Sequence, residues 1–179
     1  ARRARLEAER NDADAIDFAG DLATMPDRTA VTTAMDGQTR LFVARQDSFS
    51  RQTEQLEKRR AQIAAQIEGV QAQQAAITTQ LTLLRAELTD QQSLLAKGLT
   101  QSSRITALQR DEAQLMGDLG ELVASKAQAD GRATEVELEI LRLGAVRRED
   151  ANTQLRDMDA QELELVERRR ALTEQIARL

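Results

Sequence analysis

Acidic side chains are the first residues in this sequence that could carry chemistry. Glu135, Glu137 and Glu139 occupy every second position, and Asp157 and Asp159 repeat that spacing. Two carboxylates facing one cleft can act as general acid and base. On a helix, however, positions two apart point to different faces. We therefore interpret these carboxylates as a solvated surface and predict that the protein is not an enzyme.

Basic side chains form four short clusters. They are Arg2, Arg3 and Arg5; Arg59 and Arg60; Arg147 and Arg148; and Arg168, Arg169 and Arg170. Acidic residues lie at helical spacing from each cluster, so we expect mostly exposed ion pairs. The net charge of −5 and a pI near 5.0 also argue against nucleic acid as a partner.

Several other site chemistries lack their residues altogether. The 179 residues include no Cys and no His. The usual ligands of zinc, haem and iron–sulfur clusters are therefore missing, as are a Cys nucleophile and a His base. We predict no cofactor and no bound metal. No apolar run is long enough to span a bilayer, so we expect no membrane contact by this segment.

The composition is typical of long helices. Aromatic residues make up only 2% of the chain and charged residues 31%, and Ala, Leu, Glu, Arg and Gln are frequent. The one proline, Pro26, lies in an Asp-rich stretch, and Gly98 follows Lys97 as a helix-stop signal. We predict a short helix over 1–11, an irregular connection over 12–30 with a helical turn near 16–22, a helix over 31–97, a turn over 98–101 and a helix over 102–179. Pro26, near the end of the connection, suits the first turn of the outgoing helix.

The two long predicted helices carry apolar seams that mirror each other about the turn. Five pairs of seam residues have numbers that sum to 199: Leu84 with Leu115, Ile77 with Leu122, Val70 with Ala129, Ile63 with Val136, and Leu56 with Leu143. Five more sum to 200: Leu81 with Leu119, Ile67 with Ala133, Leu95 with Ile105, Phe42 with Met158, and Met35 with Leu165. The seam continues to Leu172 and Ile176. Spacing near 3.5 residues favours coiled-coil packing.

We therefore predict an all-α fold, a long antiparallel coiled-coil helical hairpin with a broken first arm. Residues 31–97 alone would extend roughly 100 Å at about 1.5 Å per residue. The return helix is the longer arm, and the helix over 1–11 would lie beside its overhang, end to end with the outgoing helix. Both predicted ends run on in mid-pattern, so we expect one domain excised from a larger protein.

The turn is the part of such a hairpin best placed to reach a partner. Lys97, Gly98, Leu99 and Thr100 form it, and Leu99 has no seam partner. An apolar side chain on a projecting loop favours a contact role.

The sequence resembles the α-helical hairpin of periplasmic adaptor subunits of type I secretion systems, the membrane fusion proteins of the HlyD-like family. Within it, the protease and lipase exporter branch is most similar. The matching segments are 5–10, the stretch Ile16 to Leu22, 38–45, and above all 94–104 with Leu108, Arg110, Ala113, Leu115 and Gly117.

The resemblance implies a periplasmic part of an inner-membrane-anchored protein. In the family, this hairpin interrupts a lipoyl-like domain, and a β-barrel domain follows. Several copies, typically six, form a tube on an ABC transporter. The hairpin tips meet a TolC-like outer-membrane channel, and substrate passes to the exterior in one step.

The resemblance also implies a docking site at the tip. Related efflux adaptors carry Arg, Leu and Ser or Thr there at set spacing. Thr100 matches the hydroxyl position. Thr89 falls at the Arg position, for which Arg85 and Arg104 are alternatives. Ser93 falls at the Leu position, for which Leu94 is a substitute. We predict as docking residues Leu94, Lys97, Gly98, Leu99, Thr100 and Arg104. Two other functions stay open: an adaptor of a tripartite drug-efflux pump, and a self-associating coiled-coil scaffold.

Overall fold

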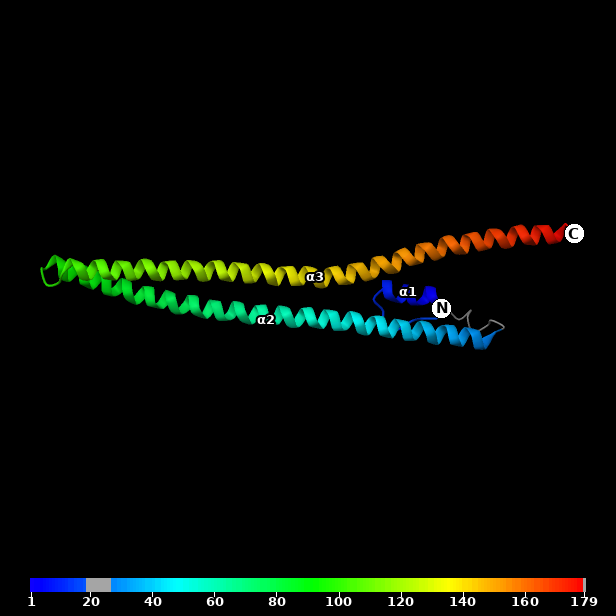
Figure 1. Ribbon diagram of the computed structural model, residues 1–179, viewed down its shortest axis with the longest axis horizontal. Helices are drawn as coiled ribbons and strands as arrows, with labels where there is room; N and C mark the ends of the chain where they lie inside the picture. Colours follow the sequence, from blue (N-terminus) through cyan, green and yellow to red (C-terminus); the bar gives the residue numbers. More distant parts are fainter. Residues whose placement is uncertain (19–26, 179) are drawn as a thin grey trace. The chain divides into compact units, whose positions relative to one another are not determined.

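The computed structural model (Figure 1) describes residues 1–18 and 27–178. Three helices form this part of the chain: α1 over Arg2–Arg10, α2 over Arg28–Ala96 and α3 over Ser102–Ala177. The described residues include no strand, and none of their helices has a stretch long and apolar enough to cross a membrane. The all-α helical hairpin predicted from the sequence is confirmed.

Helix boundaries follow local capping chemistry. α2 begins at Arg28 rather than residue 31, because Asp27 caps it: the Ala30 backbone N–H donates to Asp27 Oδ1 at 3.0 Å. Residues 16–18 are not helical, and the rest of the expected turn near 16–22, together with Pro26, lies outside the described residues.

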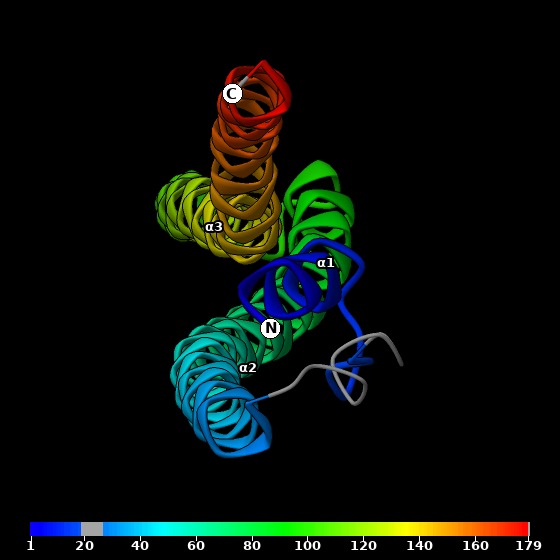
Figure 2. The same ribbon diagram turned by 90° about the vertical axis from the view of Figure 1, so that its right-hand side faces the viewer.

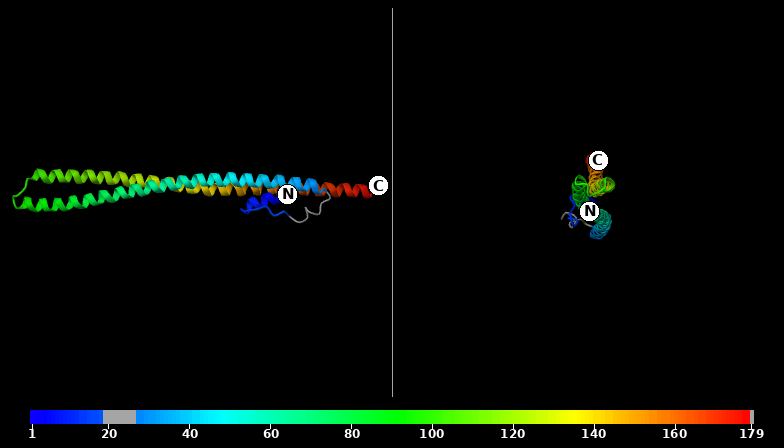
Figure 3. Two further views of the ribbon diagram at one scale, coloured as in Figure 1. Left: turned by 90° about the horizontal axis from the view of Figure 1, so that it is seen from below. Right: turned by 90° about the vertical axis from the view of Figure 1, so that its left-hand side faces the viewer.

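The chain divides into two compact units. We call residues 56–138 the turn unit, and residues 1–55 with 139–179 the terminal unit. α2 and α3 each contribute to both. In the turn unit the two helices run side by side in opposite directions (Figure 3). Its core is the seam expected from the sequence, with the following residues buried: Ile63, Val70, Leu81, Ile105, Leu108, Ala129 and Val136.

The predicted register holds in the turn unit. Ile77 and Leu122 line one groove between the helices, and Leu81 and Leu119 line another. An ion pair joins Arg85 Nε to Glu112 Oε1 at 2.7 Å across the helix pair. Leu95 is the exception, since 38% of it is exposed close to the turn.

The terminal unit packs differently from the prediction. α1 lies alongside both α2 and α3 (Figures 1 and 2) instead of continuing α2 end to end. Leu6 of α1 is fully buried against Ala151 and Leu155 of α3, and Met158 packs on the same cluster. Asp12 follows α1 with a positive φ of 53°.

Beyond the residues that α1 covers, the predicted seam fails toward the end of α3. Phe42 is 2% exposed and Met158 is half-buried. In contrast, Leu165, Leu172 and Ile176 are 64%, 53% and 71% exposed, so the expected continuation of the seam, including the pairing of Met35 with Leu165, is wrong.

Candidate docking site at the turn

The turn is built by backbone hydrogen bonds that end α2. The Leu99 N–H donates to the Leu94 carbonyl at 2.9 Å, and the Gly98 N–H donates to the Leu95 carbonyl at 2.9 Å. This pair of bonds is the Schellman motif, which needs a left-handed residue at its centre. Gly98 supplies it with a φ of 71°.

This motif leaves Leu99 outside the core. Leu99 is 71% exposed, the most exposed large apolar residue of the described part of the turn unit. Lys97 and Gly98 are exposed beside it, whereas Leu94 on the last turn of α2 is half-buried. The turn therefore presents an apolar side chain next to a cation.

The other predicted docking residues are held from within the turn unit. Thr100 is half-buried, and its Oγ1 donates to Gln91 Oε1 at 3.0 Å. Arg104 on the first turn of α3 pairs with Glu87 of α2, and 55% of its side chain stays exposed. Both contacts connect α2 with residues that follow Leu99, so they tie together the two ends of the turn.

A second cluster, of buried charged side chains, lies in the terminal unit, where sequence reasoning did not place one. The Glu9 carboxylate is 1% exposed and bridges two cations, with Oε1 at 2.5 Å from Arg5 Nη1 and Oε2 at 3.1 Å from Arg45 Nη1. Arg5 is itself 3% exposed and donates through Nε to Gln38 Oε1 at 2.7 Å. The i,i+4 spacing of Arg5 and Glu9 was visible in the sequence, but it was expected at an exposed surface.

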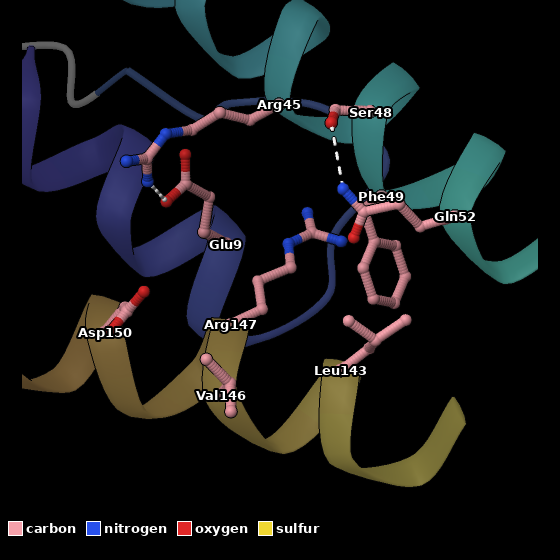
Figure 4. Close-up of a pocket in the computed structure, with 9 residues that line it drawn as sticks. All are labelled: Glu9, Arg45, Ser48, Phe49, Gln52, Leu143, Val146, Arg147 and Asp150. Atoms are coloured by element: carbon pink, nitrogen blue, oxygen red, sulfur yellow. Dashed lines mark hydrogen bonds and ion pairs between the residues drawn. The ribbon is translucent and has the colours of Figure 1, made fainter. Parts of the chain in front are cut away.

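The carboxylate of Glu9 also borders a pocket of about 370 Å³ between α1, α2 and α3 (Figure 4). Arg147 crosses this pocket, with its guanidinium carbon 4.9 Å from the centre of the Phe49 ring. Its Nη1 donates to Asp12 Oδ1 at 3.2 Å, while Nε and Nη2 are buried without a hydrogen-bond partner. The ring face stabilises the cation, which limits the cost of those two unmade bonds.

Charges in and around this pocket balance one another. Arg45 and Arg147 are offset by Glu9 and Asp150 along the lining. On the first turn of α1, Arg3 Nη2 contacts Asp159 Oδ1 at 2.5 Å and Glu162 Oε2 at 2.7 Å. The hydrogen bond to Asp159 is the main cause that raises the pKa of the Arg3 guanidinium. We interpret the network as the fastening of α1 to α2 and α3.

The carboxylates considered first for catalysis do not form a cleft. Glu135, Glu137, Glu139 and Asp157 are exposed, and Asp159 is occupied by Arg3. Within residues 1–18 and 27–178, no group of three or more Asp and Glu side chains is placed to hold a metal ion.

The three helices and the turn define the class of fold, a long α-helical hairpin. Residues 1–175 match the model of the family described as AprE, long alpha-helical hairpin. The chain belongs to this family.

Two other proteins are similar to this chain, one in sequence and one in structure. The type I secretion system membrane fusion protein PrsE of Rhizobium meliloti (strain 1021) is 41% identical over all 179 residues. The crystal structure of the soluble domain of LipC, a membrane fusion protein of a type I secretion system, matches 90% of this chain with a TM-score of 0.82 and 26% identity. The chain spans 41% of the length of PrsE and 77% of the LipC chain.

Proposed function

We propose that this chain is the periplasmic hairpin of a type I secretion adaptor, with a structural and docking role and no catalytic one. The observation that carries the proposal is the family match over residues 1–175, which spans α1, α2, the turn and all but the last two residues of α3. The similarity to PrsE and LipC, both membrane fusion proteins of type I secretion systems, supports it.

In this proposal the turn meets the helical ends of a TolC-like outer-membrane channel. Leu99 is the central contact, because an exposed apolar side chain gains most from being covered. Lys97 and Gly98 border it, and Leu94, Thr100 and Arg104 hold the turn in shape. An ABC transporter of the inner membrane would be contacted by parts of the protein outside this chain, and several copies, typically six, would stand together in the periplasm.

Site-specific photo-crosslinking in secreting cells tests this role. A photoreactive residue at position 99 is expected to capture an outer-membrane channel protein. The same residue at position 163, where Leu163 is 64% exposed in the terminal unit, is the matched control and should not capture it. Capture of the channel from both positions, or from neither, would contradict docking through the turn.

A charge introduced at the turn tests whether docking through the turn is required for secretion. Leu99→Asp and Thr100→Asp are each expected to block secretion, because an unpaired carboxylate would be desolvated at the docking surface. Helix content measured by circular dichroism should stay unchanged for Leu99→Asp, since the side chain is 71% exposed. Normal secretion by the double variant would reject the proposed site.

A further inference from the structure

Two side-chain contacts join the last part of α2 to the residues that follow the turn. In the first, Thr100 Oγ1 donates to Gln91 Oε1 at 3.0 Å, and we call this contact the Thr100 brace. In the second, the Arg104 guanidinium pairs with the Glu87 carboxylate, and we call it the Arg104 brace. The residue numbers of each pair sum to 191, so the two braces span the same offset along the chain. Glu87 and Gln91 are four positions apart and lie on one face of α2.

The backbone at Leu99 is restrained from both directions along the chain. On the preceding side, the Leu99 N–H donates to the Leu94 carbonyl at 2.9 Å. On the following side, the Thr100 brace attaches the next residue to α2. The direction in which Leu99 projects therefore depends on Gln91, a residue eight positions earlier in the chain.

The hydroxyl group of Thr100 is directed to Gln91. A threonine hydroxyl has a single proton, and here that proton is used in the Thr100 brace. Thr100 and Gln91 are half-buried, whereas residues 97–99 are exposed. As long as the brace is present, the hydroxyl has no proton to donate to a docking partner.

Arg104 lies where a cation is unfavourable unless an acidic side chain balances it. It belongs to the first turn of α3, at the positive end of the helix dipole, and that turn contains no acidic residue. Glu87 supplies the countercharge from α2. The stability of α3 therefore does not account for an arginine at this position, whereas the contact with α2 does.

We propose that Gln91 and Glu87 are positioning residues, which fix the direction of the exposed residues 97–99 during docking. Gln91 acts through the Thr100 hydroxyl. Glu87 acts through the Arg104 guanidinium. Neither of these two groups touches the channel. The inference rests on the proposed function and deepens it, because it separates the residues that contact the channel from those that hold them in place.

Removal of the Thr100 brace from either side tests the role of Gln91. The measured quantity is capture of the channel in secreting cells by the photoreactive residue at position 99. Thr100→Val and Gln91→Leu nearly keep the side-chain size but remove the hydrogen bond, so each is expected to lower capture roughly two- to tenfold. The double variant should capture as much as either single variant, because only one interaction is lost. Helix content measured by circular dichroism should stay unchanged.

A conservative variant and a neighbouring position provide the controls. Thr100→Ser keeps the hydroxyl and should capture like the chain without a further substitution. Gln92→Leu, at an exposed position next to Gln91, should also leave capture unchanged. Loss of capture in Thr100→Val but not in Gln91→Leu would show that the hydroxyl contacts the channel itself, and this result would overturn the proposal.

Charge reversal tests the Arg104 brace. Glu87→Arg and Arg104→Glu each place two like charges side by side, so each is expected to lower capture from position 99 several-fold. Combined, they form an ion pair of reversed polarity and should restore most of the capture. Arg104→Glu also places an acid in the first turn of α3, which favours the helix, so a loss of helix would not explain its lower yield. A combined variant no better than Arg104→Glu would show that the guanidinium contacts the channel directly, against the role of Glu87.

Failure of this inference is distinguishable from failure of the proposed function. If the chain without further substitutions captures the channel from position 99 and the brace variants capture it equally well, only the positioning roles are wrong. If that chain captures no channel, docking through the turn is rejected, and the positioning roles are rejected with it.

Discussion

Glu9 joins α1 to α2 through its ion pair with Arg45. Its carboxylate is the shared partner of Arg5 and Arg45, and both Glu9 and Arg5 are almost completely buried. A buried ion pair contributes little net free energy compared with an apolar pair, but removing one partner leaves a charge desolvated and unpaired. Glu9 therefore serves to fix where α1 binds more than to increase stability.

Replacement of this carboxylate by an amide should loosen α1. Glu9→Gln is expected to reduce the free energy of local unfolding of α1 by about 3–5 kcal/mol, because Arg5 loses its countercharge in a buried position. Hydrogen exchange of the amides over 5–10 measures the effect. Glu162→Gln, which removes an exposed partner of Arg3, should leave the exchange of these amides almost unchanged, because solvent screens an exposed ion pair. Equal protection in both variants would show that the buried pair does not hold α1.

At the scale of elements, the end of α2 is set by one backbone conformation. Gly98 has a φ of 71° at the centre of the Schellman motif. A side chain in this left-handed region crowds the following carbonyl, and glycine avoids that cost. The turn thus depends on the absence of a Cβ at position 98.

Two alanine substitutions should therefore have opposite signs. Gly98→Ala is expected to lower the free energy of unfolding by about 1–2 kcal/mol, and Gly117→Ala, in the middle of α3, to raise it by about 1 kcal/mol. Urea denaturation followed by circular dichroism measures both. Gly98→Asn should be tolerated better than Gly98→Ala, because asparagine adopts this conformation more readily. A stabilising Gly98→Ala would mean that the turn is not held at a positive φ.

The helices of the turn unit could be predicted from the sequence because heptad periodicity and antiparallel pairing were both visible in it. Val70, Ala129 and Val136 are buried where the seam placed them. In the terminal unit the same periodicity was misleading. A seam shows which face of α3 is apolar but not which helix covers it, and α1 covers it at Ala151 and Leu155.

The candidate docking residues were also visible in the sequence, whereas the buried network was not. Gly98 after Lys97 marks a helix end by its chemistry alone, and Leu99 follows without a seam partner. Arg5 and Glu9 have the spacing of an ordinary surface pair. Their burial depends on Gln38 and Arg45, more than 25 positions away along the chain, and a local pattern does not encode that.

At the scale of the whole molecule, the division into two units predicts separate unfolding. Contacts concentrate within residues 56–138 and within the terminal unit. Proteins open locally in cooperative groups of contacts, so a defect in one unit need not expose the other.

Truncation of Leu6 tests this independence. Leu6→Ala is expected to destabilise the terminal unit by about 2–5 kcal/mol, since the side chain is fully buried against Ala151 and Leu155. Amides of α1 should exchange faster, while those over 63–84 keep their protection. Leu163→Ala, at an exposed position, should change neither group of amides. Faster exchange throughout both groups in Leu6→Ala would show one cooperative unit instead of two.

The backbone bonds that close the turn have a further consequence for recognition. Leu99 and Gly98 each donate to a carbonyl of the last turn of α2, so the main chain at Leu99 is already ordered before any partner arrives. Association then loses little conformational entropy at that position, which is the advantage of a preorganised ligand. A partner that binds here would select a shape that is present beforehand, and its affinity would reflect the fit of a single leucine more than the folding of a loop.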